Sequence, residues 1–135
     1  MSQPIPLAKI LGHPEANGLY RFPIGAVLPG AIRLAGQDLA GKSALLKTLA
    51  KALAFPDWFG RNWDALADCL TDLSWHEGAV ALLIDDAAVP ETEAPDDWGA
   101  LLAILADAAH YWRSEGRPFA VFLQGGHAAY PRVAA

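Results

Sequence analysis

The chain has 135 residues, of which 53% are hydrophobic and 19% are charged, a composition typical of one globular domain rather than of a disordered segment. It lacks the ~18–20 uncharged apolar residues in a row that span a bilayer, and its N-terminus lacks the basic start and apolar stretch of a secretory signal. Its single cysteine excludes an internal disulfide and a cysteine-rich zinc site. We therefore expect a soluble cytoplasmic protein.

Charge is distributed unevenly along the chain. Twelve of the fifteen acidic residues, but only one of the ten basic residues (Arg61), lie between residues 57 and 107. A field of this sign repels nucleic acid and attracts basic partners. Acidic surfaces also keep small proteins soluble without any partner, so charge alone leaves both interpretations open. Neither interpretation includes a nucleic-acid or membrane ligand.

The first thirty residues contain five prolines and four glycines, a density that few regular elements survive. We expect residues 1–30 to form an arm packed on the domain, with residues 19–22 as a short edge strand. The domain itself is predicted to cover residues 31–124, and residues 125–135 form a short tail.

The domain begins with a predicted strand over residues 31–35, which Gly36 ends. Residues 41–53 then have the 3.6-residue apolar period of an amphipathic helix, with lysines away from the apolar face. Its inward-facing residues are Leu45, Leu46, Leu49 and Leu53.

A loop with exposed aromatic residues leads into a second predicted helix, for which Asn62 is a good N-cap. The predicted buried side of this helix consists of Trp63, Leu66, Cys69, Leu70 and Leu73. Asp64, Asp68 and Asp72 recur every four residues, so they share one face. Like charges at this spacing cost about 0.2–0.5 kcal/mol per pair. This acidic stripe suggests a surface displayed to a positively charged partner.

The remaining elements alternate between strands and helices. Residues 79–84 and 119–123 are continuous apolar runs, typical of strands buried on both faces. Residues 85–97 are predicted to be an acidic loop, and residues 98–113 a helix. Together these elements predict an α/β fold with a small three-stranded parallel β-sheet packed against helices.

Residues 36–43, which run from Gly36 to Ser43, match the phosphate-loop pattern G-x-x-x-x-G-K-S. Asp85, at the end of a predicted strand, resembles the aspartate that supports magnesium in such proteins. However, the four variable positions contain no glycine, and Asp38 would bring a negative charge among the phosphates. A nucleotide-binding protein is therefore the alternative hypothesis, and an ordinary strand, turn and helix start is favoured.

No catalytic or metal-binding group is expected. Cys69 and His76 could form a nucleophile and base, but Cys69 lies on the apolar face of its helix and is expected to be a buried hydrophobic residue. The four histidines show no metal-ligand spacing. The acidic residues of 85–97 lack the glycine-containing spaced loop of a calcium site. We expect neither enzymatic activity nor a cofactor.

Residues 55–71, FPDWFGRNWDALADCLT, strongly resemble the sequence that characterises the barstar family, intracellular inhibitors of the extracellular ribonuclease barnase. The resemblance extends more weakly from Ala31 to Leu123. Residues 36–49 align without a gap to the family's first strand and helix, which gives the phosphate-loop match an ordinary explanation.

The resemblance implies a barstar-like fold and one-to-one binding of a basic ribonuclease, whose active site is blocked by an acidic helix and the aromatic loop before it. By position, Asp68 corresponds to the aspartate that occupies the phosphate site, and Asp64 is the second acidic contact. The other residues implied to bind the partner are Trp58, Phe59, Gly60, Asn62 and Trp63.

The sequence departs from the family pattern at four of its positions. Arg61 replaces an acidic residue, Ala67 replaces an aromatic one, Leu73 stands at an interface tryptophan, and Tyr111 stands at a glutamate of a later helix. These differences leave open a second alternative, a barstar-fold binding module with a partner that is not a nuclease.

Overall fold

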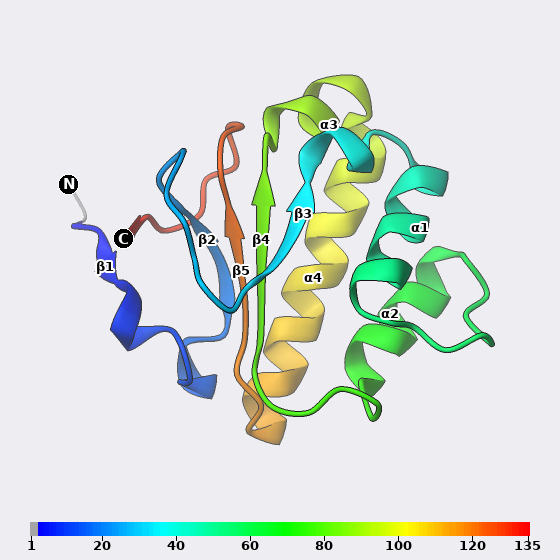
Figure 1. The fold of residues 1–135 in the computed structure, drawn as a ribbon, viewed down its shortest axis with the longest axis horizontal. Coiled ribbons are helices and arrows are strands. Elements are labelled where there is room, and N and C mark those ends of the chain that lie inside the picture. Colours follow the sequence, from blue (N-terminus) through cyan, green and yellow to red (C-terminus); the bar gives the residue numbers. More distant parts are fainter. Residues whose placement is uncertain (1–2) are drawn as a thin grey trace.

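A computed structural model describes residues 3–135. Its main sheet has four parallel strands in the order β2 (Gly18–Arg21), β5 (Phe119–Leu123), β4 (Val80–Asp85) and β3 (Ile32–Ala35). Helices α1 (Lys42–Ala52), α2 (Trp63–Asp72) and α4 (Pro95–Glu115) pack on one face (Figure 1). The predicted α/β class, with a parallel sheet packed against helices, is confirmed.

The sheet has four strands rather than the three predicted. The additional strand, β2, comes from the proline-rich first thirty residues and pairs with β5, with Leu19 opposite Val121. It lies at the sheet edge, as expected for residues 19–22. Such pairing between residues about a hundred positions apart leaves little local trace in the sequence, which explains why the edge strand expected at residues 19–22 was not counted in the predicted sheet. The division into an arm (residues 1–30), a domain (residues 31–124) and a tail (residues 125–135) stays a prediction.

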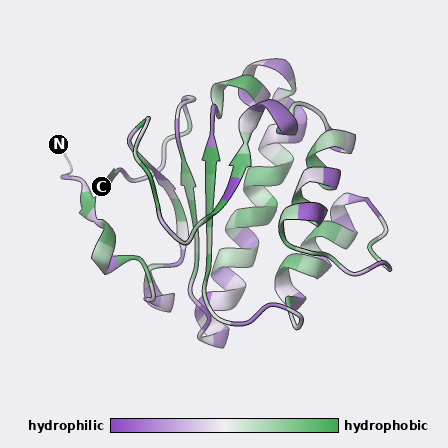
Figure 2. Ribbon diagram, in the orientation of Figure 1, coloured by the Kyte–Doolittle hydropathy of each residue, from purple (hydrophilic) through white to green (hydrophobic). Residues whose placement is uncertain are grey.

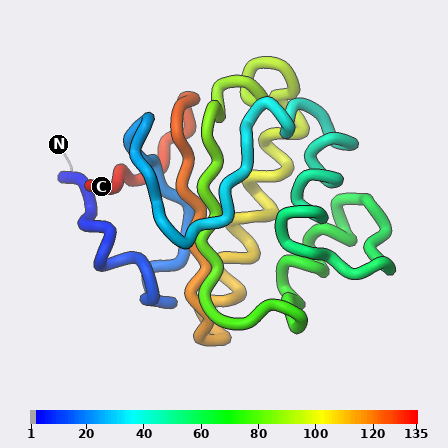
Figure 3. The backbone as a smooth tube through the Cα atoms, viewed as in Figure 1, coloured from blue at the N-terminus to red at the C-terminus, as the bar shows by residue number. Residues whose placement is uncertain are grey.

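The central strands are buried on both faces, as their continuous apolar sequences predict. Leu82 and Ile84 of β4 face the helices, whereas Leu83 belongs to a second core on the opposite face. That second core contains residues from the arm and the tail: Ile10, Tyr20, Phe22, Leu28 and Val133. Figure 2 shows the hydrophobic colouring of β4 and β5, and Figure 3 shows the segment between β2 and β3 returning beside the sheet.

Two short elements bring the ends of the described chain together. β1 (Ile5–Pro6) pairs in parallel with β6 (Val133–Ala134), and short 3-10 helices cover Leu7–Lys9 and Pro14–Ala16. The segment predicted to be a short tail therefore contains a strand. None of the helices within residues 3–135 is long and apolar enough to cross a membrane.

The predicted acidic loop over residues 85–97 is largely helical. It contains α3 (Ala88–Glu93) and the first turn of α4, which begins at Pro95 rather than at residue 98. Proline is well tolerated at the first helical position because its missing N–H would have no partner there. Asp96 and Asp97 in the same turn interact favourably with the helix dipole. These residue types are as typical of helix starts as of loops.

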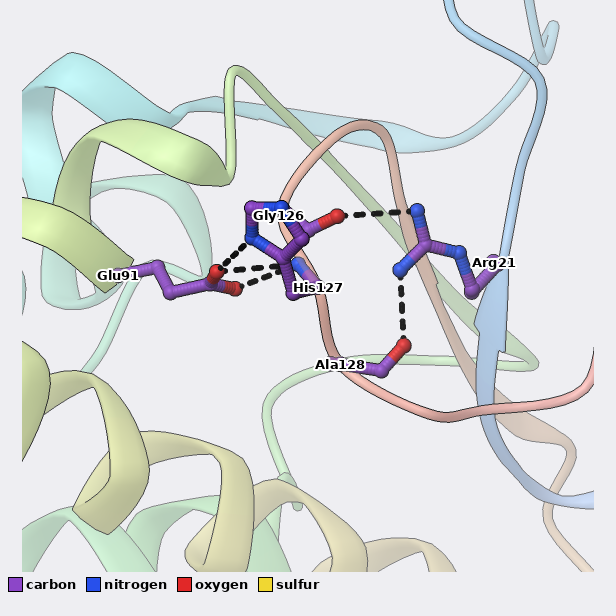
Figure 4. A network of polar contacts seen from close by, with 5 residues as sticks. All are labelled: Arg21, Glu91, Gly126, His127 and Ala128. Carbon is purple, nitrogen blue, oxygen red and sulfur yellow. Dashed lines mark hydrogen bonds and ion pairs between the residues drawn. The ribbon is translucent and has the colours of Figure 1, made fainter.

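Residues 126–128 are fixed by one side chain on each side of them, Arg21 and Glu91 (Figure 4). The guanidinium of Arg21 in β2 donates to the carbonyl oxygens of Ala128 and Gly126, at 2.8 and 3.1 Å. The backbone N–H of His127 donates to the Glu91 carboxylate at 2.8 Å, and His127 Nδ1 lies 2.7 Å from Glu91 Oε1. Residues 126–128 are thus held between β2 and α3.

Asn17 joins the start of β2 to the C-terminal part of α4 and the start of β5. Its buried side-chain amide donates to the carbonyl oxygens of Arg117 and Ala109, and its Oδ1 accepts the N–H of Phe119 at 2.7 Å. Because removing one partner leaves buried polar groups unsatisfied, we expect Asn17→Ala to lower the free energy of unfolding by about 2–4 kcal/mol. Urea denaturation measures this.

The exposed amide of Gln37 supplies a control for that substitution. Gln37→Ala should change the free energy of unfolding by less than about 0.5 kcal/mol. Equal stability of the Asn17→Ala variant and the native chain would show that the arm is not held by this residue.

Glu91 should make stability depend on pH. Its pKa is lowered, mainly because its carboxylate accepts the backbone N–H of His127 and also its side-chain N–H. A carboxylate whose folded-state pKa is lowered contributes stability above the unfolded pKa of about 4.3, and that contribution is lost as pH falls through the folded-state value. We expect the stability difference between the native chain and Glu91→Gln to shrink as pH falls below about 5.

Urea denaturation across this pH range measures the effect, with Glu93→Gln on the same helix as the exposed control. A difference between the native chain and Glu91→Gln that stays constant down to about pH 3 would contradict the contribution assigned to the Glu91 carboxylate.

Candidate protein-interaction site

Helix α2 begins where the sequence predicts, because Asn62 caps it. Asn62 has extended backbone angles (φ −137°, ψ 173°), and its Oδ1 accepts the N–H of Ala65 at 2.8 Å. This bond satisfies one of the backbone donors that a helix leaves free at its N-terminus. The preceding residue, Arg61, has a φ of +52°, so the chain turns sharply between Gly60 and the helix.

The inner face of α2 is fully buried. Leu66, Cys69, Leu70 and Leu73 each have 0% exposure, as predicted for the structural side of this helix. Burial of side chains of this size stabilises by about 1.5–3 kcal/mol each. The apolar face therefore fixes the rotation of α2 about its axis, and with it the direction in which the opposite face points.

Two side chains outside α2 hold its C-terminal end. Trp112 of α4 donates from Nε1 to the carbonyl oxygen of Leu70 at 2.7 Å, and Arg117 donates to that of Leu73 at 3.2 Å. The guanidinium of Arg117 also lies 4.5 Å from the centre of the Trp112 ring. A positive charge at a helix C-terminus is favourable and counteracts the unfavourable position of Asp72 near the same end.

The outer face of α2 carries the acidic stripe. Asp64, Asp68 and Asp72 are all exposed. Within residues 3–135, the ion pairs join His13 to Glu15, Arg33 to Asp85 and His127 to Glu91, so no aspartate of α2 belongs to one. The cost of placing three like charges together is therefore not offset by an ion pair within the described chain.

Of the three aromatic residues in the loop between α1 and α2, only Trp58 is exposed. Trp58 is 61% exposed, and its ring packs edge-on against Trp75 with 6.3 Å between centroids. Phe59 is half-buried and packs against Phe55 at 5.0 Å. Trp75 is fixed by its Nε1–H bond to the carbonyl oxygen of Leu53. Phe59 thus attaches the loop to the core, whereas Trp58 is displayed on a supported surface.

Trp63 differs from the expectation of a core residue because it is only half-buried. It packs against the main core, and the ammonium nitrogen of Lys42 lies 5.5 Å from its ring centre. Of the residues predicted to bind a partner, the exposed ones are Trp58, Gly60, Asn62, Asp64 and Asp68, and the half-buried ones are Phe59 and Trp63.

Cys69 has the properties of a packed hydrophobic residue. Burial raises the pKa of its thiol, and the negative charges of Asp72 and Asp68 raise it further. A thiol with a raised pKa carries little of the reactive thiolate form. The ring of His76 contacts the carbonyl oxygen of Ala79 instead. The nucleophile and base considered from the sequence are therefore not brought together.

The phosphate-loop match from Gly36 to Ser43 does not form an open phosphate site. Residues Gly36–Leu39 form a 3-10 helix, and the Gly36 N–H donates to Asp85 Oδ1 at 3.2 Å. The N–H of Lys42, at the start of α1, donates to Asp97 Oδ2 at 2.9 Å. Carboxylates of the chain thus occupy backbone donors that a phosphate would need. Among residues 3–135, no cluster of three or more potential ligands could hold a metal ion.

A family model described as Barstar (barnase inhibitor) matches residues 30–124. The chain belongs to the barstar family. The barstar match spans β3 through β5 and therefore includes α2 and the loop before it. It leaves out β2, so the fourth strand of this barstar sheet comes from outside the matched region. Barstars are an inhibitor family rather than an enzyme family, and a protein partner is the general expectation for this member.

Sequence reasoning did not assign the residues that support the site. Trp75 holds Trp58 at the surface, and Arg117 binds the end of α2. In the sequence, Trp75 is one of several aromatic residues between positions 55 and 75, and no spacing sets it apart. Arg117 lies in the turn after α4, and nothing in its local sequence indicates a contact with α2.

Asn62 allows the capping contribution to be measured apart from binding. Asn62→Ala should lower the free energy of unfolding by about 1 kcal/mol, because a free N–H remains in the first turn of α2. Asn62→Asp should retain most of the stability, since a carboxylate also caps a helix. Thermal denaturation measures both variants, and equal loss in the two would contradict the capping role.

Proposed function

We propose that this chain inhibits a basic ribonuclease by inserting α2 and the loop before it into the enzyme's active site. The observation that carries this proposal is the acidic stripe of α2, which is exposed, stands on a helix with a fully buried inner face and has no ion pair in the described chain. It stands beside an exposed aromatic residue, Trp58. Membership of a family of barnase inhibitors supports the same conclusion.

Each residue in the proposal has a chemical role. Asp68 takes the place of a substrate phosphate, because a carboxylate accepts strong, charge-assisted hydrogen bonds from arginine and histidine. Asp64 makes the second acidic contact. Trp58 is the aromatic anchor that buries its ring against the enzyme, as tryptophan does at interface hot spots. Gly60 and Asn62 bring the loop and the helix into contact with the same surface.

The acidic block between residues 57 and 107 contributes to the rate of binding. Its field attracts a basic nuclease over a distance, which raises the association rate at low salt. The proposal places binding at one-to-one stoichiometry in the cytoplasm, where the nuclease would otherwise cleave the cell's own RNA.

The partner differs from barnase in the surface it presents. Arg61 is exposed and adds a positive charge at the edge of the site, whereas Leu73 is fully buried and makes no contact with a partner. Tyr111 on α4 is 41% exposed. A nuclease that carries an acidic or polar group opposite Arg61 fits this arrangement better than one with a uniformly basic rim.

Asp68 and Asp72 provide a matched pair of variants, since both are exposed on the same face of α2. Asp68→Ala should weaken binding of the cognate basic ribonuclease by about 2–5 kcal/mol, because positive groups in its active site lose their partner. Asp72→Ala should change the binding free energy by less than about 1 kcal/mol, as rim charges do. Calorimetry with the ribonuclease, together with inhibition of RNA cleavage, measures both.

Equal affinity of the Asp68→Ala variant and the native chain would contradict the role assigned to α2. Capture of a partner without nuclease activity, in a manner that depends on Asp64 and Asp68, would instead support a binding module with a different partner. The phosphate-loop alternative predicts a thermal shift on adding ATP with magnesium, and the occupied donors of Gly36 and Lys42 lead us to expect none.

A further inference from the structure

Strand β3 forms an outer edge of the sheet that the described chain leaves open. It pairs with β4 alone. The opposite edge strand, β2, is partly paired by the C-terminal segment. Arg21 forms a β-bridge with Arg132, and the backbone N–H of Arg21 donates to the carbonyl oxygen of Pro131 at 2.7 Å. No strand from residues 3–135 lies along the outer side of β3. Edge strands present a row of backbone donors and acceptors that another chain can pair with.

A groove runs beside this edge. Its volume is about 580 Å³, within the range of sites that hold small ligands or peptide side chains. One wall is β3, and the other is the side of α1 that carries Lys47, Thr48 and Lys51. The residues that line it are Arg33, Leu34, Ala35, Asp38, Lys47, Thr48, Lys51 and Ala52.

The groove is positively charged in a chain whose net charge is −5. Lys47 and Lys51 are exposed on successive turns of α1, and neither belongs to an ion pair of the described chain. The opposing acid within the lining is Asp38, which is exposed. Arg33 is already paired with Asp85. Two lysines therefore face one aspartate, and an acidic ligand is favoured.

We propose that β3 and α1 form a second protein-binding groove, which takes an extended acidic polypeptide segment as an added strand of the sheet. Backbone pairing along β3 supplies affinity, and acidic side chains of the segment pair with Lys47 and Lys51. This mode of recognition is strand addition at a sheet edge. It uses none of the residues assigned to ribonuclease binding.

The geometry favours an acidic peptide over other occupants. A nucleic acid satisfies the lysines, but its phosphates supply only acceptors and leave the outward carbonyl groups of β3 without donors. A second copy of this chain, paired edge to edge, brings the lysines of one copy against those of the other. Lysines beside an edge strand can also serve only to prevent self-association. The experiment separates these roles.

The probe is a dye-labelled octapeptide that alternates valine and glutamate, titrated with the full chain and followed by fluorescence anisotropy. The variant is Lys47→Glu combined with Lys51→Glu. Its control, with the same change in net charge, is Lys9→Glu combined with Arg113→Glu, two exposed residues outside the groove. We expect the dissociation constants of the peptide for the native chain and for the control to agree within about twofold. The dissociation constant for the groove variant should be at least about tenfold higher.

Two further peptides test the backbone and the charge. Alternate N-methylation keeps every glutamate but removes backbone donors, so it should weaken binding about tenfold. A peptide with lysine in place of glutamate should not bind. Absence of binding by the valine–glutamate peptide, or binding unaffected by N-methylation or by the groove variant, overturns the proposal.

Two additional outcomes would also overturn it. An oligouridylate that binds the groove as tightly as the peptide, with the same dependence on Lys47 and Lys51, would make the groove a general anion site. Sedimentation equilibrium could instead show that the native chain is a dimer. If the dimer dissociation constant changed in the variant with Lys47→Glu and Lys51→Glu, the edge would be assigned to a second copy of this chain.

Discussion

Burial of the central strands on both faces is the constraint on which the rest of this molecule depends. Leu82 and Phe119 face the helices, while Leu83 and Phe122 face the other way, so each face needs its own cover. The helices cover one face. The arm, the segment returning from β2 and the tail cover the other, which explains why a proline-rich N-terminus is folded onto the sheet. The amide of Asn17 and the guanidinium of Arg21 then hold these covering segments in place.

Packing of the helices on one face of the sheet also determines which face of α2 is exposed. Helix α2 packs against α4 through its fully buried inner residues, so its outer face takes no part in the core. Trp112 and Arg117 bind the carbonyl groups of Leu70 and Leu73 at its C-terminal end, and the positive charge of Arg117 there opposes the negative charge of Asp72. Packing therefore fixes the position of α2, so a protein that bound its outer face would have to order little of this helix. The same packing of α2 thus fixes the helix and leaves its aspartates exposed without an ion pair in the described chain.

Most elements from β3 to β5 were predictable, because the strands and the helices α1, α2 and α4 each have a local signal. The leucines of α1 recur with a helical period, Asn62 caps α2, and β5 is a continuous apolar run. A short strand was also expected at residues 19–22, but its place in the main sheet was not predictable in the same way, because β2 pairs with β5 about a hundred residues later. α3 was missed because an acidic segment with two prolines has the composition of a loop. The four-residue spacing predicted that the aspartates of α2 share one face, and they are exposed, while their role in binding stays a prediction. Trp75 and Arg117 act through contacts that only the fold creates.

The pairing of β1 with β6 has a consequence for the covalent path of the chain. It brings the two ends of the described chain side by side, and Figure 1 shows both ends on the opposite side of the view from α2. Adjacent ends allow a short linker to join them, so the fold suits circular permutation and insertion into a loop of another protein. A fusion at either end leaves the acidic face unobstructed. A new cut placed in an exposed loop would then leave the pairing of β1 with β6 and the packing of α2 in place.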